Sequence, residues 1–374
     1  MDALNRRTAL HIAGISGLGL AGCAPQPAET PPTPSHIPAA PTSPAPSPSS
    51  DNRPRWPLTG HLLEDAAAPM HAAVAVKVPD NEREHPQAGI NDADIVFVEL
   101  DGYPDSDGYS STRLMPVYHA TMPPDVAPVR SIRPTDVPLL APITAVLASS
   151  GGSGWVKNYV AQFSEFIVSD LTYLAMKGTD AYSVNKDRIR VYQGDTYYDR
   201  ALVCHPGALS QASEAFPDGP PAAYFPFATD VDQPSAAAGQ AATHVGVPWK
   251  GDGYLMGYDF DAASGTYLRS MPWGEHVQLD GARVTTDNVL VIKAAQYTDK
   301  LAEGDGNAEP IQDLIDAGGE FLYATGGKYV TGTWAKKAVD SPFEFTLDDK
   351  TPLLMTPGRT FVEIPNDDAV IVVE

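Results

Sequence analysis

The stretch from residue 126 to residue 163 constrains the fold more than any other part of the chain. An apolar segment leads into a Ser/Gly loop, SSGGSG at residues 149–154, and apolar residues follow this loop at helical spacing. Those apolar residues are Val156, Tyr159, Val160 and Phe163. The sequence therefore predicts a strand that leads through the loop into the N-terminus of a helix.

A junction of this kind attracts anions, because unpaired backbone N–H groups and the positive end of the helix dipole meet there. Nearby arginines add positive charge. The predicted ligand-binding residues are Arg113, Arg130, Ser131, Arg133, Ser150, Gly151, Gly152 and Ser153. The alternative is that the arginines form a structural ion network with Asp80, Glu99 or Asp136.

Apolar runs in the first folded part predict strands at residues 72–78, 94–100, 113–119 and 145–149. Pro116 predicts that the third is an edge strand or a bulged one, because proline cannot donate a ladder hydrogen bond. Runs that alternate with helical patterns indicate an α/β layer whose strands are covered on both faces. Ligand crevices in open α/β sheets form at strand ends.

Residues 205–244 are rich in Ala, Pro, Gly and Gln, which predicts a connection between two domains. Short strands are predicted beyond it, at residues 254–260, 289–297, 320–325, 328–334, 343–347, 360–364 and 369–373. Gly326-Gly327 indicates a two-residue hairpin between two of them. The predicted fold is an α/β N-terminal domain, residues 58–204, with a smaller, mostly antiparallel β C-terminal domain, residues 245–374.

The N-terminus resembles a bacterial lipoprotein signal over residues 1–23. Arg6 and Arg7 precede an apolar segment, and Leu20-Ala21-Gly22-Cys23 closes it. The resemblance implies that the Cys23 thiol accepts a lipid and anchors the protein to the outer face of the cytoplasmic membrane. An ordinary cleaved secretory signal or a short apolar anchor are the alternatives, although a spanning helix needs ~20 apolar residues. Export by the general or by the twin-arginine route stays open.

Residues 24–57 predict a disordered tether. They contain twelve of the chain's 36 prolines, interleaved with Ser, Thr and Ala, and such a composition cannot bury apolar surface. A proline-rich spacer is semi-extended. The tether is therefore expected to hold the folded part away from the membrane.

The chain of 374 residues has a formal net charge of −22. This acidity excludes nucleic acid as a partner, because binding to a phosphate backbone needs a basic face. It also predicts repulsion from anionic lipid headgroups. The expected membrane contact is therefore the lipid on Cys23 alone.

Two cysteines are present, and lipidation of Cys23 leaves Cys204 without a partner for a disulfide. His205 follows Cys204 directly. A nucleophilic pair is one interpretation, but neighbouring residues rarely face each other productively. A buried or idle thiol is the other interpretation.

Asp80 and Glu99 are the candidate catalytic residues, as a general acid and base of the kind used in glycoside hydrolysis. Residues 105–108, DSDG, resemble a calcium loop only in part, because the matching twelve-residue pattern lacks carboxylates at both of its ends. The nine histidines show no metal-ligand spacing. No metal and no cofactor are predicted.

Several short motifs lie along the folded region. They are PLTG at residues 57–60, AVKVPDN at 75–81, HPQAGI at 85–90, ADIVFVEL at 93–100, APVRSIRPTDVPLLAP at 127–142, SSGGS at 149–153, DNVLVI at 287–292, GTW at 332–334 and PGRTFVEI at 357–364. In this order they resemble the YerB-like lipoprotein family, known by its domain of unknown function, DUF3048. The resemblance implies an envelope lipoprotein with two domains, and it implies no established activity.

The chain departs from the family pattern in three places. A longer acidic loop, residues 101–111, replaces the family's Glu-Gly-Gly turn, and Pro79 lies inside the Val-Asp-Asn motif. Residues 203–206, VCHP, stand where Pro-His-Asn is common. This last departure puts a functional role for His205 in doubt.

Two functions from different classes follow. The first is a membrane-anchored extracytoplasmic lipoprotein that binds an anionic cell-wall polymer or an envelope protein through the Arg/Ser/Gly crevice. The second is a cell-envelope hydrolase that uses Asp80 and Glu99. Alanine at Glu99 separates them, because it should abolish turnover by the hydrolase and leave ligand binding largely intact.

Overall fold

The computed structural model describes residues 53–63, 71–104, 110–192, 194–198, 200–213, 221–229, 233–250 and 254–374. The predicted signal segment with Cys23, the predicted tether up to residue 52 and the sequence DSDG at residues 105–108 lie outside the described residues. At the end of the predicted tether, Arg55 forms a β-bridge with Leu62. The described structure therefore includes the last residues of the predicted tether.

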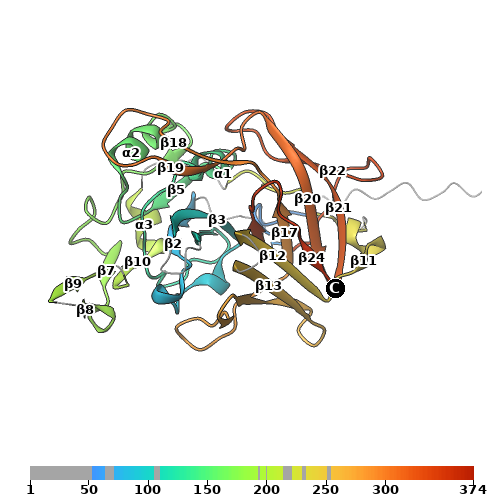
Figure 1. Ribbon diagram of the computed structural model, residues 1–374, viewed down its shortest axis with the longest axis horizontal. Helices are drawn as coiled ribbons and strands as arrows, with labels where there is room; N and C mark the ends of the chain where they lie inside the picture. Colours follow the sequence, from blue (N-terminus) through green and yellow to red (C-terminus); the bar gives the residue numbers. More distant parts are fainter. Residues whose placement is uncertain are drawn as a thin grey trace, which may run out of the picture. The chain divides into compact units, whose positions relative to one another are not determined.

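The largest sheet is mixed and has twelve strands, in the order β11-β21-β20-β17-β23-β3-β4-β1-β5-β6, with β2 beside β4 and β22 beside β21. Figure 1 labels β2, β3, β5, β11, β17, β20, β21 and β22 of this sheet. Its strands are β1 (Ala73–Val76), β2 (Val78–Pro79), β3 (Ile95–Pro104), β4 (Ser110–Tyr118), β5 (Ala145–Ala148), β6 (Ile167–Val168), β11 (Gln240–Ala241), β17 (Asn288–Ile292), β20 (Ala317–Thr325), β21 (Lys328–Lys336), β22 (Glu344–Leu347) and β23 (Thr360–Glu363).

This sheet is continuous between the two halves of the sequence. Strand β23 lies between β3 and β17 and runs parallel to both. Parallel pairing of strands so far apart in sequence needs long connections. The predicted division at residues 205–244 is therefore no break in the sheet, and the domain boundaries themselves stay a prediction.

A second, antiparallel sheet of six strands has the order β15-β14-β13-β12-β24, with β16 beside β14. Its strands are β12 (His244–Lys250), β13 (Tyr254–Asp261), β14 (Thr266–Met271), β15 (Gly274–Glu275), β16 (Thr285–Thr286) and β24 (Val372–Val373). The ring of Tyr258 on β13 packs edge-to-face on Phe361 of β23, with centroids 6.0 Å apart. This contact places the second sheet against the middle of the first.

Three two-stranded pairs complete the described strands. They join β7 (Tyr182–Val184) to β10 (Leu202–Cys204), β8 (Arg190–Tyr192) to β9 (Asp195–Tyr197), and β18 (Gln296–Asp299) to β19 (Glu309–Gln312). The predicted strand at residues 289–297 is thus two strands, β17 and β18. They separate because β18 pairs with β19 outside the large sheet.

The described helices are few and short. They are α1 (Asp136–Leu140), α2 (Gly154–Ala161), α3 (Pro206–Ala212) and the 3-10 helices η1 (Glu82–Glu84), η2 (Ile90–Asp92), η3 (Lys186–Arg188) and η4 (Ser235–Ala238). The antiparallel C-terminal half is confirmed. The α/β prediction for the N-terminal half holds in part, because its sheet is mixed and α3 packs against β1 and β5, whereas the strongest contacts on β3 and β4 from outside the sheet come from β19 and β12.

Strand β4 is a central strand, so the edge-strand prediction from Pro116 is wrong. On one side Pro116 pairs with Val96 of β3. On the other side, pairing with β1 ends at Val117 and pairing with β2 begins at Leu114. Pro116 therefore lies where the neighbouring strand is interrupted and no hydrogen-bond donor is required of it.

The hairpin predicted at Gly326-Gly327 is confirmed between β20 and β21. Both glycines have positive φ, 57° and 74°, as a two-residue turn of type I′ requires. No helix among the described residues has the length and apolar character needed to cross a bilayer.

Candidate functional site

The Ser/Gly loop forms at the end of β5 and leads into α2, as predicted. Its first part lies beside the segment that holds Arg130. The backbone N–H of Ser150 donates to the carbonyl of Arg130 at 2.9 Å, and the hydroxyl oxygens of Ser131 and Ser150 are 3.5 Å apart. The N–H of Ile132 donates to the carbonyl of Gly151 at 2.9 Å.

The second part of the loop, at the N-terminus of α2, is covered by residues 303–307. The N–H of Trp155 donates to the carbonyl of Asp305 at 3.2 Å. A Cβ built on Gly154 would lie 1.6 Å from Oδ1 of Asp305, and one built on Gly306 would lie 2.5 Å from the Cβ of Ser153. A carboxylate of the chain itself therefore occupies the place where an anion was predicted to bind beside Ser153.

Arg113 and Arg133 are buried and paired internally. Their Nη2 atoms lie 2.8 Å and 2.6 Å from Oδ1 of Asp101, and Nε of Arg133 lies 3.2 Å from Glu309. Both arginines are 3 % exposed. For these two residues the structure favours the ion-network alternative, with Asp101 and Glu309 as the partners instead of Asp80 or Glu99.

Arg130 differs from them, because its side chain is 30 % exposed. Its Nε lies 3.5 Å from the carboxylate of Glu84. Arg188, at the end of η3, donates to the backbone carbonyl of Glu84 at 3.1 Å. Burial and the charge of Arg200 lower the pKa of Arg188, and Glu84 opposes this effect.

Arg130 and Arg188 thus contact Glu84, and the charge of Arg200 acts on Arg188. We call these four residues the Glu84 arginine cluster. Burial lowers the pKa of Arg113 to about 10, an effect that Asp101 opposes and that Arg133 and Arg130 reinforce. Arg188 and Arg200 were not among the ligand-binding residues predicted from the sequence. No local pattern marks them, because residues 186–200 contain four basic and three acidic residues.

Asp80 lies in a second network, where the two halves of the chain meet. Arg269 of β14 donates to both of its carboxylate oxygens, at 3.2 Å and 2.8 Å, and Thr112 donates to it at 2.9 Å. Burial alone would raise the pKa of Asp80, but the Arg269 guanidinium and the hydrogen bonds hold it well below its usual range. Asp80 is therefore ionised and fully buried.

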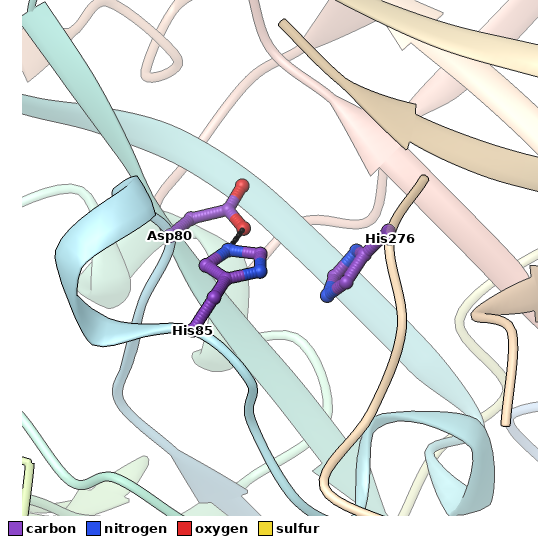
Figure 2. A group of neighbouring side chains, drawn as sticks. All are labelled: Asp80, His85 and His276. Atoms are coloured by element: carbon purple, nitrogen blue, oxygen red, sulfur yellow. Dashed lines mark hydrogen bonds and ion pairs between the residues drawn. The ribbon is translucent and has the colours of Figure 1, made fainter. Parts of the chain in front are cut away.

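Among the described residues, Asp80, His85 and His276 form a group with metal-ligand geometry, because one donor atom of each lies within 4.8 Å of the others (Figure 2). Their hydrogen bonds argue against a metal ion. Nδ1 of His276 faces the Arg269 guanidinium at 2.8 Å, and its Nε2 faces Oε1 of Gln87 at 2.8 Å. Burial and the Arg269 charge lower the pKa of His276, which is neutral. The group is a satisfied hydrogen-bond network.

Glu363 on β23 extends this network. It accepts hydrogen bonds from Trp249 at 2.7 Å and from the Tyr258 hydroxyl, and Arg269 lies 3.7 Å from it. Burial raises its pKa, which Arg269 counteracts. The network therefore joins β23 of the first sheet to β12, β13 and β14 of the second.

Glu99 is fully buried in the network that contains Arg113, Arg133 and Asp101, and it forms an ion pair with Lys77 there. Lys77 also donates to Asp136 at 2.7 Å, and burial lowers its pKa to about 8. The structure thus separates Asp80 and Glu99 into two closed networks. The catalytic assignment of these two carboxylates stays a prediction, and the geometry favours structural roles for both.

Cys204 is buried in β10, and burial raises the pKa of its thiol. The ring of His205 contacts the carbonyl of Pro124 and the hydroxyl of Ser183, each at 2.9 Å, and Asp125 at 2.9 Å. Both ring nitrogens of His205 therefore have partners other than the thiol, which agrees with the interpretation of an idle cysteine.

Comparison with known proteins matches both halves of the chain to one family. Residues 58–201 match the DUF3048 N-terminal domain and residues 245–362 match the DUF3048 C-terminal domain, both described as protein of unknown function. The crystal structure of YerB protein from Bacillus subtilis is similar, with a TM-score of 0.67 and 20% identity over 86% of this chain and 100% of that one. No curated protein gives a match. The chain therefore belongs to the DUF3048 family of proteins of unknown function, and its fold is that of YerB protein.

Proposed function

We propose that the chain is a lipid-anchored protein on the outer face of the cytoplasmic membrane that binds an anionic ligand of the cell envelope at the Glu84 arginine cluster. The observation that supports this most is the charge of the cluster. Arg130 lies 3.5 Å from the carboxylate of Glu84, Arg188 donates to the backbone carbonyl of Glu84, and the charge of Arg200 acts on Arg188. The whole chain has a net charge of −22, so a group of three arginines on it is a specific feature.

The arginines of the cluster suit a carboxylate or a phosphate. Arginine offers planar, multiple N–H donors that match both groups. The buried atoms Nη1 of Arg188 and Nε of Arg200 have no hydrogen-bond partner among the described residues. A bound anion would supply acceptors for these donors, and each charge-assisted hydrogen bond would contribute roughly 1.5–3 kcal/mol.

The proposed ligand-binding residues therefore differ from those predicted from the sequence. Arg113 and Arg133 hold the domain together through Asp101. Ser131 and Ser150 lie next to the backbone of Arg130 and stay candidate contacts for the ligand. Arg188 and Arg200 take the place of the two paired arginines.

The location rests on the sequence of residues 1–23. If Cys23 is lipidated, the Cys23→Ala variant should be left unprocessed or released from the membrane, because the thiol that accepts the lipid is removed. Fractionation of cells that express each form measures this. A variant that is cleaved at the same place and held at the membrane as firmly as wild type would contradict the anchor.

Thermal melting of the full chain with and without phosphate or citrate tests the binding site. We expect both anions to raise the melting temperature of the wild type, because a ligand that binds only the folded state stabilises it. Arg200→Ala should remove most of this increase. Lys337→Ala is the matched control, since Lys337 is exposed and pairs with Glu344 on another part of the sheet. An anion effect of equal size in both variants would count against the cluster.

A further inference from the structure

A groove of about 690 Å³ lies between the large sheet and the C-terminal segment of the chain. Leu322 of β20 and Thr331 of β21 are among the residues that line it on one side, and Ile371 and Val373 are among those that line it on the other. Figure 1 labels β20, β21 and β24, which border the groove. The Glu84 arginine cluster contributes no residue to it.

Strand β24 is an edge strand whose second side is open. Among the described strands it pairs with β12 alone. Glu374 and His244 exchange two backbone hydrogen bonds, each of 3.1 Å, and such pairs alternate with non-hydrogen-bonded pairs along an antiparallel ladder. Val373 pairs with Val245 in the next position. The N–H and C=O groups of Val373 therefore point away from β12, toward the open side.

This edge has the features of a strand that accepts another strand. Val370 and Val372 are 78 % and 40 % exposed. Residues 366–374 contain no lysine and no proline, the residues that commonly protect an edge from pairing. A peptide added beside β24 would project every second side chain toward the same face. Because Ile371 and Val373 line the groove, one of these two sets of side chains would enter it.

The charges in the groove indicate which peptide fits. Its lining has three carboxylates and one ammonium group, those of Glu320, Asp348, Asp368 and Lys293. Lys293 pairs with Glu320 at 2.8 Å. Asp348 and Asp368 accept hydrogen bonds from the neutral side chains of Thr331 and Asn366. The groove is therefore acidic, and it suits a peptide with lysine or arginine at alternate positions.

We propose that β24 binds an extended basic segment of a partner protein, which adds a strand to this edge and places its cationic side chains beside Asp348 and Asp368. Main-chain hydrogen bonds supply affinity in this mode of recognition, and alternate side chains supply specificity. A second copy of β24 fits less well, because Asp367, Asp368 and Glu374 would bring like charges together.

Calorimetric titration of the full chain with blocked hexapeptides tests the proposal. The first peptide alternates valine with lysine, the second is the same peptide with N-methylated backbone nitrogens, and the third alternates valine with glutamate. We expect the first to bind saturably and the other two to bind roughly tenfold more weakly or less, because N-methylation removes the donors of the added strand and glutamate reverses its charge.

The variants separate the backbone from the charges. Val373→Pro removes the N–H that points to the open side and no hydrogen bond to β12, so it should weaken binding of the valine-lysine peptide. Asp348→Asn combined with Asp368→Asn leaves the backbone unchanged and should weaken it roughly tenfold. Asp367→Asn is the matched control, because Asp367 is exposed and does not line the groove. This control and Arg200→Ala should bind the peptide as the wild type does.

Three results would overturn the proposal. They are no saturable binding of the valine-lysine peptide, equal binding of the lysine and glutamate peptides, and unchanged affinity in the Asp348→Asn, Asp368→Asn double variant. The double variant decides even if Val373→Pro does not fold. Size-exclusion chromatography over a range of concentrations should show a monomer. A dimer that Val373→Pro abolishes would assign the edge to a second copy and would also overturn the proposal.

Discussion

Protonation of the Asp94 carboxyl group affects the stability of the fold. Burial raises its folded pKa to about 6, above the usual value of ~3.9 for an unfolded chain. The folded state therefore binds the proton more tightly than the unfolded state. The stabilisation of the folded state by protonated Asp94 is fully present below pH ~3.9 and is lost as the pH rises through about 6.

We therefore predict that Asp94→Asn flattens the dependence of stability on pH. In the wild type this residue lowers the free energy of unfolding by at most about 3 kcal/mol between pH 4 and pH 7. Urea unfolding at a series of pH values measures the difference between the two proteins. Parallel curves for wild type and variant across this range would show that Asp94 titrates alike in both states.

Residue roles were predictable from the sequence only where the partner is close in the chain. The sequence indicated an ion network or an anion site for Arg133, and the structure supplies Asp101 and Glu309 as its partners. The sequence predicts that Asp101 lies in a loop, but β3 extends to residue 104. The partner of Asp80, Arg269, is 189 residues away, and no local pattern indicates such a pair.

At the scale of elements, the hairpin of β20 and β21 was predictable because two adjacent glycines, Gly326 and Gly327, form its turn. Gly326 has open space around the position of a Cβ, whereas a Cβ on Gly327 would lie 2.8 Å from Phe260. Both positions have positive φ. The left-handed conformation alone costs an L-residue roughly 1–2 kcal/mol.

We predict that Gly327→Ala destabilises the protein more than Gly326→Ala does, because only the first adds a contact with the Phe260 ring to the backbone strain. The free energy of unfolding of both variants, measured in urea, gives the comparison. Equal losses would mean that Phe260 moves aside at no cost.

The short helices were not predictable from the pattern of the sequence. Apolar runs such as residues 94–100 indicate strands buried on both faces, and helices are the usual cover of such strands. Here a second sheet and the β18–β19 pair provide contacts instead. Residues 254–260 and 328–334 were recognised as strands, but hydrophobic periodicity does not say against which sheet a strand packs.

For the whole molecule, the main feature is that both halves of the sequence contribute strands to one sheet. Strand β23 joins the halves through parallel pairing on both sides, and the buried Asp80–Arg269 pair joins them again. Replacing either partner alone would leave a buried charge unpaired, which typically costs 3–5 kcal/mol. The two family domains therefore depend on each other for their packing.

We predict that a cut within residues 214–239 does not separate the halves. The nicked protein should elute as one species in size-exclusion chromatography and should melt in a single transition, because the broken segment lies outside the shared strands. Intact protein is the control. Two separate species under native conditions would contradict the dependence of one half on the other.

Calorimetric titration of the full chain with inorganic phosphate tests most directly whether the Glu84 arginine cluster binds an anion. We predict saturable binding that weakens about tenfold or more in Arg188→Ala and in Arg200→Ala, since one lost charge-assisted hydrogen bond corresponds to roughly 1.5–3 kcal/mol. Lys337→Ala should bind as the wild type does. Absence of saturable binding to the wild type, or equal affinity in all four proteins, would contradict the claim.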